Sequence, residues 1–180
     1  AFGDSALAAN TTAANNTAMG NFAMSANTDG HSNTAVGAEA LDANTTGDAN
    51  VAVGYVALSA ATTGNYNTAV GRGAMAANTT ASDNTGLGYS ALSSNTTGTY
   101  NTAVGRSTLE ACTTASSNTA VGYGALAANT SAANNTAVGS LAGVAVTTGG
   151  NNVFVGQDSG KALTTGTSNV FVGYQAGDAA

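Results

Sequence analysis

The stretch Asn101-Thr102-Ala103-Val104-Gly105 is one copy of a motif that recurs along the whole chain. Its glycine returns every 17 residues, without insertion or deletion. Such a short fixed period is typical of a solenoid, in which each repeat forms one coil and stacked coils share a continuous core. The motif therefore predicts an all-β fold: a parallel β-solenoid (β-roll) of about 10–11 coils that spans 1–180 as a single repeat domain.

We number each coil from this glycine as position 0. The zero positions are Gly3, Gly20, Gly37, Gly54, Gly71, Gly88, Gly105, Gly122, Gly139, Gly156 and Gly173. Position −4 is always Asn, and stacked coils would place these amides about 4.8 Å apart, close enough for a hydrogen-bonded ladder. The structural Asn ladder is thus expected at Asn16, Asn33, Asn50, Asn67, Asn84, Asn101, Asn118, Asn135, Asn152 and Asn169.

The residues between the Asn and the glycine indicate a short strand. Position −3 is Thr or Val, −2 is mostly Ala, and −1 is always apolar. Alternation along a strand sends −3 and −1 to one face and −2 to the other. Because −1 is uniformly apolar, we expect it in the core, together with Leu or Met at +4 and Ala at +6. The variable positions +1, +2, +5, +11 and +12 are expected to face solvent. The coil reads as two or three short strands, with turns near 0 and +10.

Composition excludes several partners. Charged residues make up 7% of the chain, and its formal net charge is −6. Three Lys and Arg residues are too few to neutralise a phosphate backbone, so we expect no nucleic acid. No apolar run reaches the roughly 20 residues needed to cross a bilayer, so we expect no direct membrane insertion. The chain begins and ends within a coil, which suggests a segment of a longer fibrous protein.

The residues needed for catalysis or metal binding are sparse. The single histidine, His31, reads as an exposed turn residue, and the sole cysteine, Cys112, takes a position where most coils carry Asn. Asp42, Glu110 and Asp178 share position +5 but lie four coils apart. That separation of about 19 Å is too wide for the carboxylate pair of a glycosidase. We therefore predict no catalytic residue, no metal, no cofactor and no enzymatic activity.

Position +1 alternates between Tyr and Arg over five coils, which would bring each guanidinium within the roughly 6 Å reach of a cation–π contact. Tyr66 and Tyr100, at +12, precede the two arginines and extend the pattern to a period of two coils. One interpretation is duplication of a coil pair, with a ladder that only stiffens the rod. The other is a receptor-binding stripe, because Tyr and Arg are enriched at binding hot spots and rings stack on sugars. Its +1 members are Tyr55, Arg72, Tyr89, Arg106 and Tyr123.

Two stretches carry a resemblance to known proteins. NTAVGYGAL at 118–126 and NVFVGYQAG at 169–177 resemble repeats of phage tail-fibre proteins and related bacterial surface proteins. They are also similar to the left-handed parallel β-roll heads of trimeric autotransporter adhesins, although the usual coil of that family is shorter. The resemblance implies left-handed coils, a homotrimer of parallel rolls, and an extracellular location at a cell or virion surface. With −1 in the core, the row of Ala at −2 would lie on the other face of the strand and let a second subunit approach closely.

Three functions remain open. The leading hypothesis is a non-catalytic structural and adhesive fibre segment that attaches to a cell-surface glycan or protein receptor by avidity. The second is an ice-binding solenoid that uses stacked Thr. The adjacent Thr-Thr at +8 and +9 would point to opposite faces, and Thr at −3 with Val at −1 reads as a core pair. A flat outward Thr plane on a monomer would favour ice binding. The third is a self-assembling extracellular filament subunit.

Overall fold

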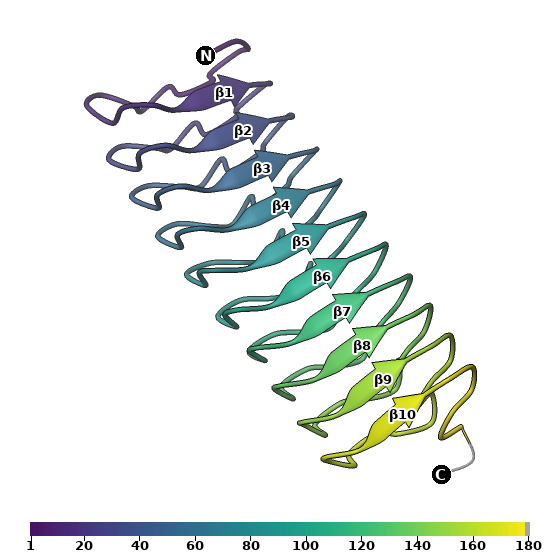
Figure 1. Ribbon diagram of the computed structural model, residues 1–180. Coiled ribbons are helices and arrows are strands. Elements are labelled where there is room, and N and C mark those ends of the chain that lie inside the picture. Colours follow the sequence, from purple (N-terminus) through teal and green to yellow (C-terminus); the bar gives the residue numbers. More distant parts are fainter. Residues whose placement is uncertain (179–180) are drawn as a thin grey trace.

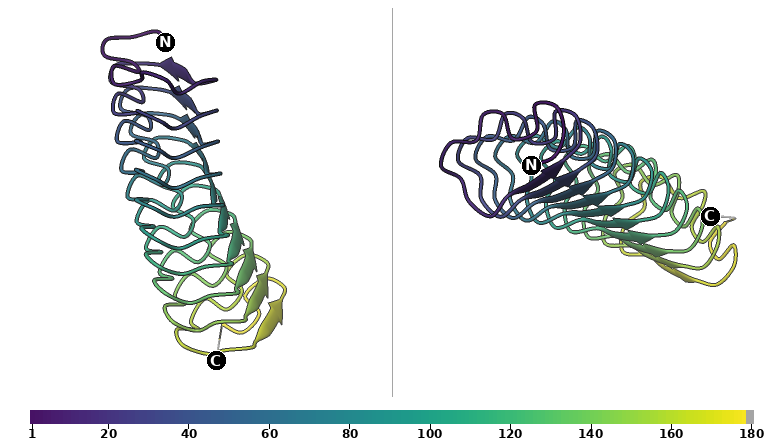
Figure 2. Two further views of the ribbon diagram at one scale, coloured as in Figure 1. Left: turned by 90° about the vertical axis from the view of Figure 1, so that its left-hand side faces the viewer. Right: turned by 90° about the horizontal axis from the view of Figure 1, so that it is seen from above.

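The computed structural model describes residues 1–178 and shows a parallel β-solenoid with 17 residues per coil (Figure 1). This confirms the predicted fold. Ten three-residue strands stack in chain order into one sheet, each in register with the next. The sheet runs along one side of an elongated, gently twisted rod (Figure 2). The strands are β1 Thr17–Met19, β2 Thr34–Val36, β3 Val51–Val53, β4 Thr68–Val70, β5 Thr85–Leu87, β6 Thr102–Val104, β7 Thr119–Val121, β8 Thr136–Val138, β9 Val153–Val155 and β10 Val170–Val172.

Each coil has one strand rather than the two or three expected. The backbone takes a positive φ at +2, +4 and +12, as at Ser107 (53°), Leu109 (50°) and Ser117 (60°). A left-handed residue cannot continue a strand, so the rest of the coil is a series of turns. These turns are held from coil to coil by backbone hydrogen bonds, such as that from Leu109 N to Ala125 O at 3.1 Å.

The two faces of the strand are the reverse of those predicted. In β6, Ala103 is fully buried, whereas Thr102 and Val104 are half-buried and lie on the outside. The prediction that position −1 fills the core is therefore wrong. Position +6 is also only half-buried, as at Ala111, whereas the burial of +4 is confirmed, as at Leu109.

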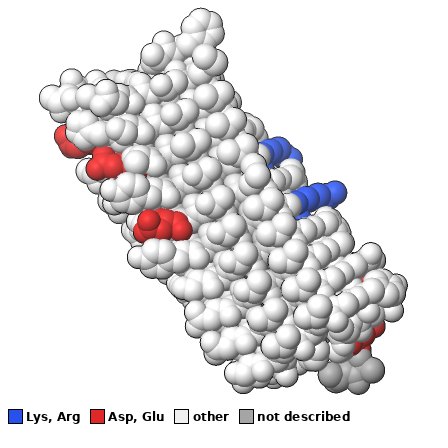
Figure 3. Space-filling view, in the orientation of Figure 1, with Lys and Arg blue, Asp and Glu red and all other residues white. Residues whose placement is uncertain are grey.

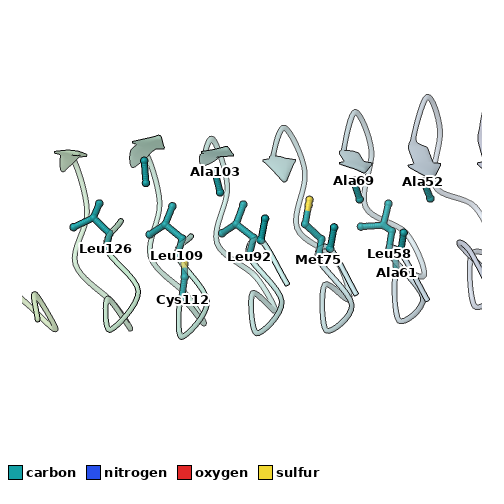
Figure 4. Close-up of a cluster of buried hydrophobic side chains, with 14 of the residues drawn as sticks. Ala52, Leu58, Ala61, Ala69, Met75, Leu92, Ala103, Leu109, Cys112 and Leu126 are labelled. Carbon is teal, nitrogen blue, oxygen red and sulfur yellow. The ribbon is translucent and has the colours of Figure 1, made fainter. Parts of the chain in front are cut away.

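The hydrophobic core is built from positions −2, +3 and +4, together with the apolar residues that some coils carry at +7 and +10 (Figure 4). The small Ala side chains at −2 of the strand pack against the Leu or Met side chain at +4, so the interior of each coil is thin. The reason for the inversion is the Asn at −4, whose side chain is buried. Alternation then places −3 outside, −2 inside and −1 outside.

The repeated glycine is required by both its conformation and its neighbours. Gly105 has a φ of 134°, a region that side chains disfavour. A Cβ on Gly105 would lie 2.6 Å from the carbonyl oxygen of Gly122 in the next coil. The glycine therefore sets the close approach of successive coils as well as the bend.

The Asn side chains at −4 bridge the coils. The backbone N–H of Asn101 donates to Asn84 Oδ1 at 2.9 Å, and Asn101 Nδ2 donates to the carbonyl of Ala115 at 2.8 Å. A second amide stack, which was not predicted, lies at +7, where Asn44 Nδ2 donates to Asn27 Oδ1 at 2.7 Å. The recurrence of Asn at +7 was its signal.

The last coils exchange bulk between two core positions. Phe154, at −2, points inward and is fully buried. Its ring fills the space beside Gly143 and Gly160, which replace the usual Leu or Met at +4. The ring of Phe171 lies 6.0 Å from that of Phe154, so the aromatic stack continues the core into the last coil.

Candidate functional site

Because Ala at −2 points into the core, the side chains at −3 and −1 form an apolar surface on the outside of the rod. We call it the Thr–Val face, defined by the side chains at −3 and −1 of β1–β10. It carries Thr or Val at −3 and Val, Leu or Met at −1. In the view of Figure 3, the centre of this face has no charged side chain. Basic side chains project from the margin at the C-terminal ends of the strands. Acidic ones lie in the N-terminal half of the margin at the strands' N-terminal ends, and others are visible on the opposite side near the C-terminal end of the rod.

The size of the Thr–Val face suits an interaction surface. Three residues span about 10 Å and nine steps between strands span about 43 Å, which gives roughly 430 Å². Monomers rarely expose contiguous apolar patches larger than a few hundred Å², and larger ones mark binding sites. Several −1 side chains are well exposed, among them Leu87 at 43% and Val138 at 40%.

The threonines of this face differ from those elsewhere in the coil. At +8, the hydroxyl donates to the next coil, as from Thr96 Oγ1 to the carbonyl of Thr113 at 3.0 Å. Within residues 1–178, no −3 Thr hydroxyl has such a protein partner, Thr102 among them. These hydroxyls are therefore free to bind water or another molecule.

The Tyr–Arg ladder at +1 borders the C-terminal ends of the strands. Arg72 lies 5.8 Å from the ring centroid of Tyr55 and 5.7 Å from that of Tyr89. Arg106 lies 5.5 Å from Tyr89 and 6.0 Å from Tyr123. All five side chains are exposed, the three rings at between 45% and 53%. The ladder therefore has the spacing expected from the sequence.

The arginines of the ladder have no acidic partner in the part of the chain that the structure describes. The one ion pair there joins Lys161 to Asp158 at 3.3 Å. Each guanidinium therefore lies between two rings, while its N–H donors remain free for an outside acceptor.

Tyr66 and Tyr100 do not join this ladder. They precede β4 and β6, whereas Arg72 and Arg106 follow those strands, so the two sets lie on opposite sides of the Thr–Val face. Both rings are exposed, at 64% and 65%. We call position +12 the N-terminal margin and the Tyr–Arg ladder at +1 the C-terminal margin.

The remaining titratable groups of interest are part of the coil structure. His31 Nδ1 accepts a hydrogen bond from the backbone N–H of Ala14 at 2.9 Å. The backbone N–H of His31 donates to Asp48 Oδ1 at 2.6 Å. Burial raises the pKa of Cys112 to about 11, so its thiol stays protonated near neutral pH. Residues 1–178 contain no detected pocket and no cluster of three residues able to hold a metal ion.

No helix in the same residues is long and apolar enough to cross a membrane. The geometry therefore offers one broad surface, the Thr–Val face with its two margins, and this is the candidate site. No family model, curated protein or solved structure matches this chain.

Proposed function

We propose that this chain is a non-catalytic rod segment of a homotrimeric fibre that attaches to a glycan or protein receptor at a cell surface. In the trimer, three Thr–Val faces pack around the long axis of the rod. The observation that carries the proposal is this uncharged, partly apolar face, which runs along all ten strands. The resemblance to tail fibres and adhesin heads supports a trimer, left-handed coils, and a place on a cell or virion surface.

The energetics favour burial of the face but do not make the trimer strong. At about 25 cal/mol per Å², burying some 430 Å² per chain would contribute on the order of 10 kcal/mol. Association costs an estimated 4–15 kcal/mol, so the face alone is marginal. Groups at the margins must therefore add contacts, or the assembly would dissociate on dilution.

The experiment that tests the trimer is a mass measurement by light scattering over a wide concentration range. We expect the trimer mass for the natural sequence and the monomer mass for Val104→Asp, with the β-rich circular dichroism spectrum kept. Thr97→Asp is the matched control, because it adds the same charge at the exposed position +9, away from the face. A monomer of the natural sequence at every concentration would contradict the proposal.

The attachment function needs its own test. Free guanidinium donors beside exposed rings suit an acidic glycan as well as a protein surface. We would measure cell-surface and glycan binding of the natural sequence and of a Tyr89→Ser, Arg106→Ser variant, beside melting temperature and mass. Binding lost at unchanged mass and stability supports a ligand-facing stripe. Stability lost with binding kept leaves the ladder a structural feature.

Ice binding is the second candidate, and one observation favours it. The Thr at −3 faces outward with its hydroxyl free, so the expectation of a Thr–Val core pair was wrong. Position −3 changes to Val at β3, β9 and β10, which interrupts the Thr stack. Inhibition of ice recrystallisation by a monomeric sample, lost in Thr102→Tyr, would favour this function over the trimer.

A further inference from the structure

The two margins of the Thr–Val face carry chemically matched residues at the three central strands β4, β5 and β6. We infer that in the trimer the C-terminal margin of each chain packs against the N-terminal margin of its neighbour, with Arg72 against Tyr66 and Arg106 against Tyr100. This inference rests on the proposed trimer, and it names which residues hold adjacent chains together.

Symmetry decides which residues meet. In a closed ring about the long axis, neighbours are related by rotation alone and stay level with each other. The contact is head-to-tail, so the end of a strand in one chain meets the start of the same strand in the next. Position +1 therefore faces position +12 across each strand.

The pairs that result are chemically matched. At β4 the guanidinium of Arg72 meets the ring of Tyr66, and at β6 that of Arg106 meets Tyr100. At β5, between them, the phenol of Tyr89 meets the carboxylate of Asp83, to which its hydroxyl can donate. The period of two coils thus appears on both margins, in phase.

Charge selects this parallel arrangement. At the central strands, Arg72 and Arg106 lie at the C-terminal margin and Asp83 at the N-terminal margin of the face. Figure 3 shows the basic side chains on one side of the rod and acidic ones on the opposite side in its N-terminal half. A ring of parallel chains brings the opposite signs together, whereas two antiparallel chains would place each arginine-bearing margin against its own copy. In the trimer, Asp83 of one chain would lie one coil, about 4.8 Å along the rod, from the level of Arg72 in its neighbour, so their opposite charges would attract.

Each margin exposes groups that its own chain leaves without a partner. Arg72 and Arg106 have free N–H donors, and neither forms an ion pair with a carboxylate of residues 1–178. Tyr66 and Tyr100 are the most exposed rings of the central coils, at 64% and 65%. A second copy of the chain covers both sets at once.

Area shows what the margins add to the contact. From +12 to +1 each strand region is up to about 20 Å wide, so face and margins together offer up to about 860 Å² per chain. A two-chain interface of standard size buries about 800 Å² per partner, whereas a chain in a trimer divides its area between two neighbours, about 430 Å² for each. The Thr–Val face alone would supply only half of this area, so burial of the margins doubles the contact with each neighbour.

Disulfide cross-linking tests the pairing. In a Cys112→Asn background, we would combine Tyr66→Cys with Arg72→Cys, and separately Tyr100→Cys with Arg106→Cys. Within one chain each pair lies at opposite ends of a strand, whereas a disulfide needs Cα atoms within about 7 Å. Oxidation should therefore give cross-linked dimers and trimers on non-reducing gels. Tyr66→Cys with Arg106→Cys is the mismatched control, displaced by two coils, and should stay uncrosslinked.

The outcomes separate this inference from the trimer itself. A trimer mass with no cross-linking, or with equal cross-linking of the mismatched pair, overturns the margin pairing and leaves the trimer standing. A monomer of the natural sequence overturns both. Loss of glycan binding in Arg72→Ser and Arg106→Ser, with the trimer undiminished on dilution, shows that the ladder faces a ligand and also overturns the pairing.

Discussion

Phe154 and Gly143 share one volume in the core, which gives a quantitative prediction. A Cβ on Gly143 would lie 2.8 Å from Cδ2 of the Phe154 ring, which is itself fully buried. Most other coils carry Ala at −2 and Leu or Met at +4, as with Ala103 and Leu109. The C-terminal coils therefore exchange a large side chain at one position for a large side chain at the other.

The magnitudes follow from this exchange. Phe154→Ala alone leaves a cavity and should lower the free energy of unfolding by about 3–5 kcal/mol. Gly143→Leu alone overpacks against the ring and should cost about 1–3 kcal/mol. The left-handed backbone at +4 already accepts Leu, since Leu109 has a φ of 50°. In the double variant the new Leu fills the cavity, so the combined cost should fall at least about 2 kcal/mol below the sum.

Urea unfolding followed by circular dichroism measures all four proteins. The control is Gly143→Leu combined with Leu41→Ala, a cavity six coils away, for which we expect additivity within about 0.5 kcal/mol. Additivity of the Phe154 and Gly143 substitutions as well would refute the shared volume, and with it the inward direction of the ring.

Three further predictions concern single residues. Gly105→Ala should cost about 2–6 kcal/mol in unfolding free energy, from positive-φ strain and the clash with the next coil. Gly173→Ala should cost less, because the nearest atom lies 3.9 Å away, and an equal cost for both would contradict this reasoning. The Cys112 thiol should resist iodoacetamide at pH 8 until the chain unfolds, and its pKa, raised from 9.0 to about 11 by burial, should make stability fall as pH rises from about 9 to 11. Rapid labelling of the folded protein would exclude the buried thiol. Burial, more than the charge of Glu39, raises the pKa of Asp42 above 3.8, so the folded state holds the proton of this carboxyl group more tightly than the unfolded state does. The stability that the protonated group contributes is therefore lost as pH rises above that value. Asp42→Asn should therefore raise the melting temperature at pH 7 but not at pH 3, and an equal effect at both would count against it.

The coil and the sheet could be predicted because one residue type recurs without a gap. A glycine every 17 residues sets the coil length, and equal coil lengths force strands to pair parallel and in register. The number of strands per coil could not be predicted in this way. Leu109 and Ser107 adopt left-handed conformations that their side chains disfavour, so local preference gives no sign of these turns.

The candidate site was predictable only in part. A coil height of about 4.8 Å places neighbouring +1 residues in contact, as found for Arg72 between Tyr55 and Tyr89. The location of Tyr66 across the strand also follows from the sequence, because it precedes β4 and Arg72 follows it. The prediction was wrong about which face of the strand between them points to the core.

That orientation is where the prediction failed, and the residues contained the answer. A buried amide ladder at −4 requires Asn101 to point inward. Alternation along an extended chain then sends Ala103 inward and Thr102 and Val104 outward, because side chains repeat with a period of two. Treating Val104 as core gave more weight to hydrophobicity than to this alternation. A valine that recurs on the outside of every coil from β6 to β10 is not needed to fill the roll, so its regularity supports the proposal that a second copy of the chain covers this face.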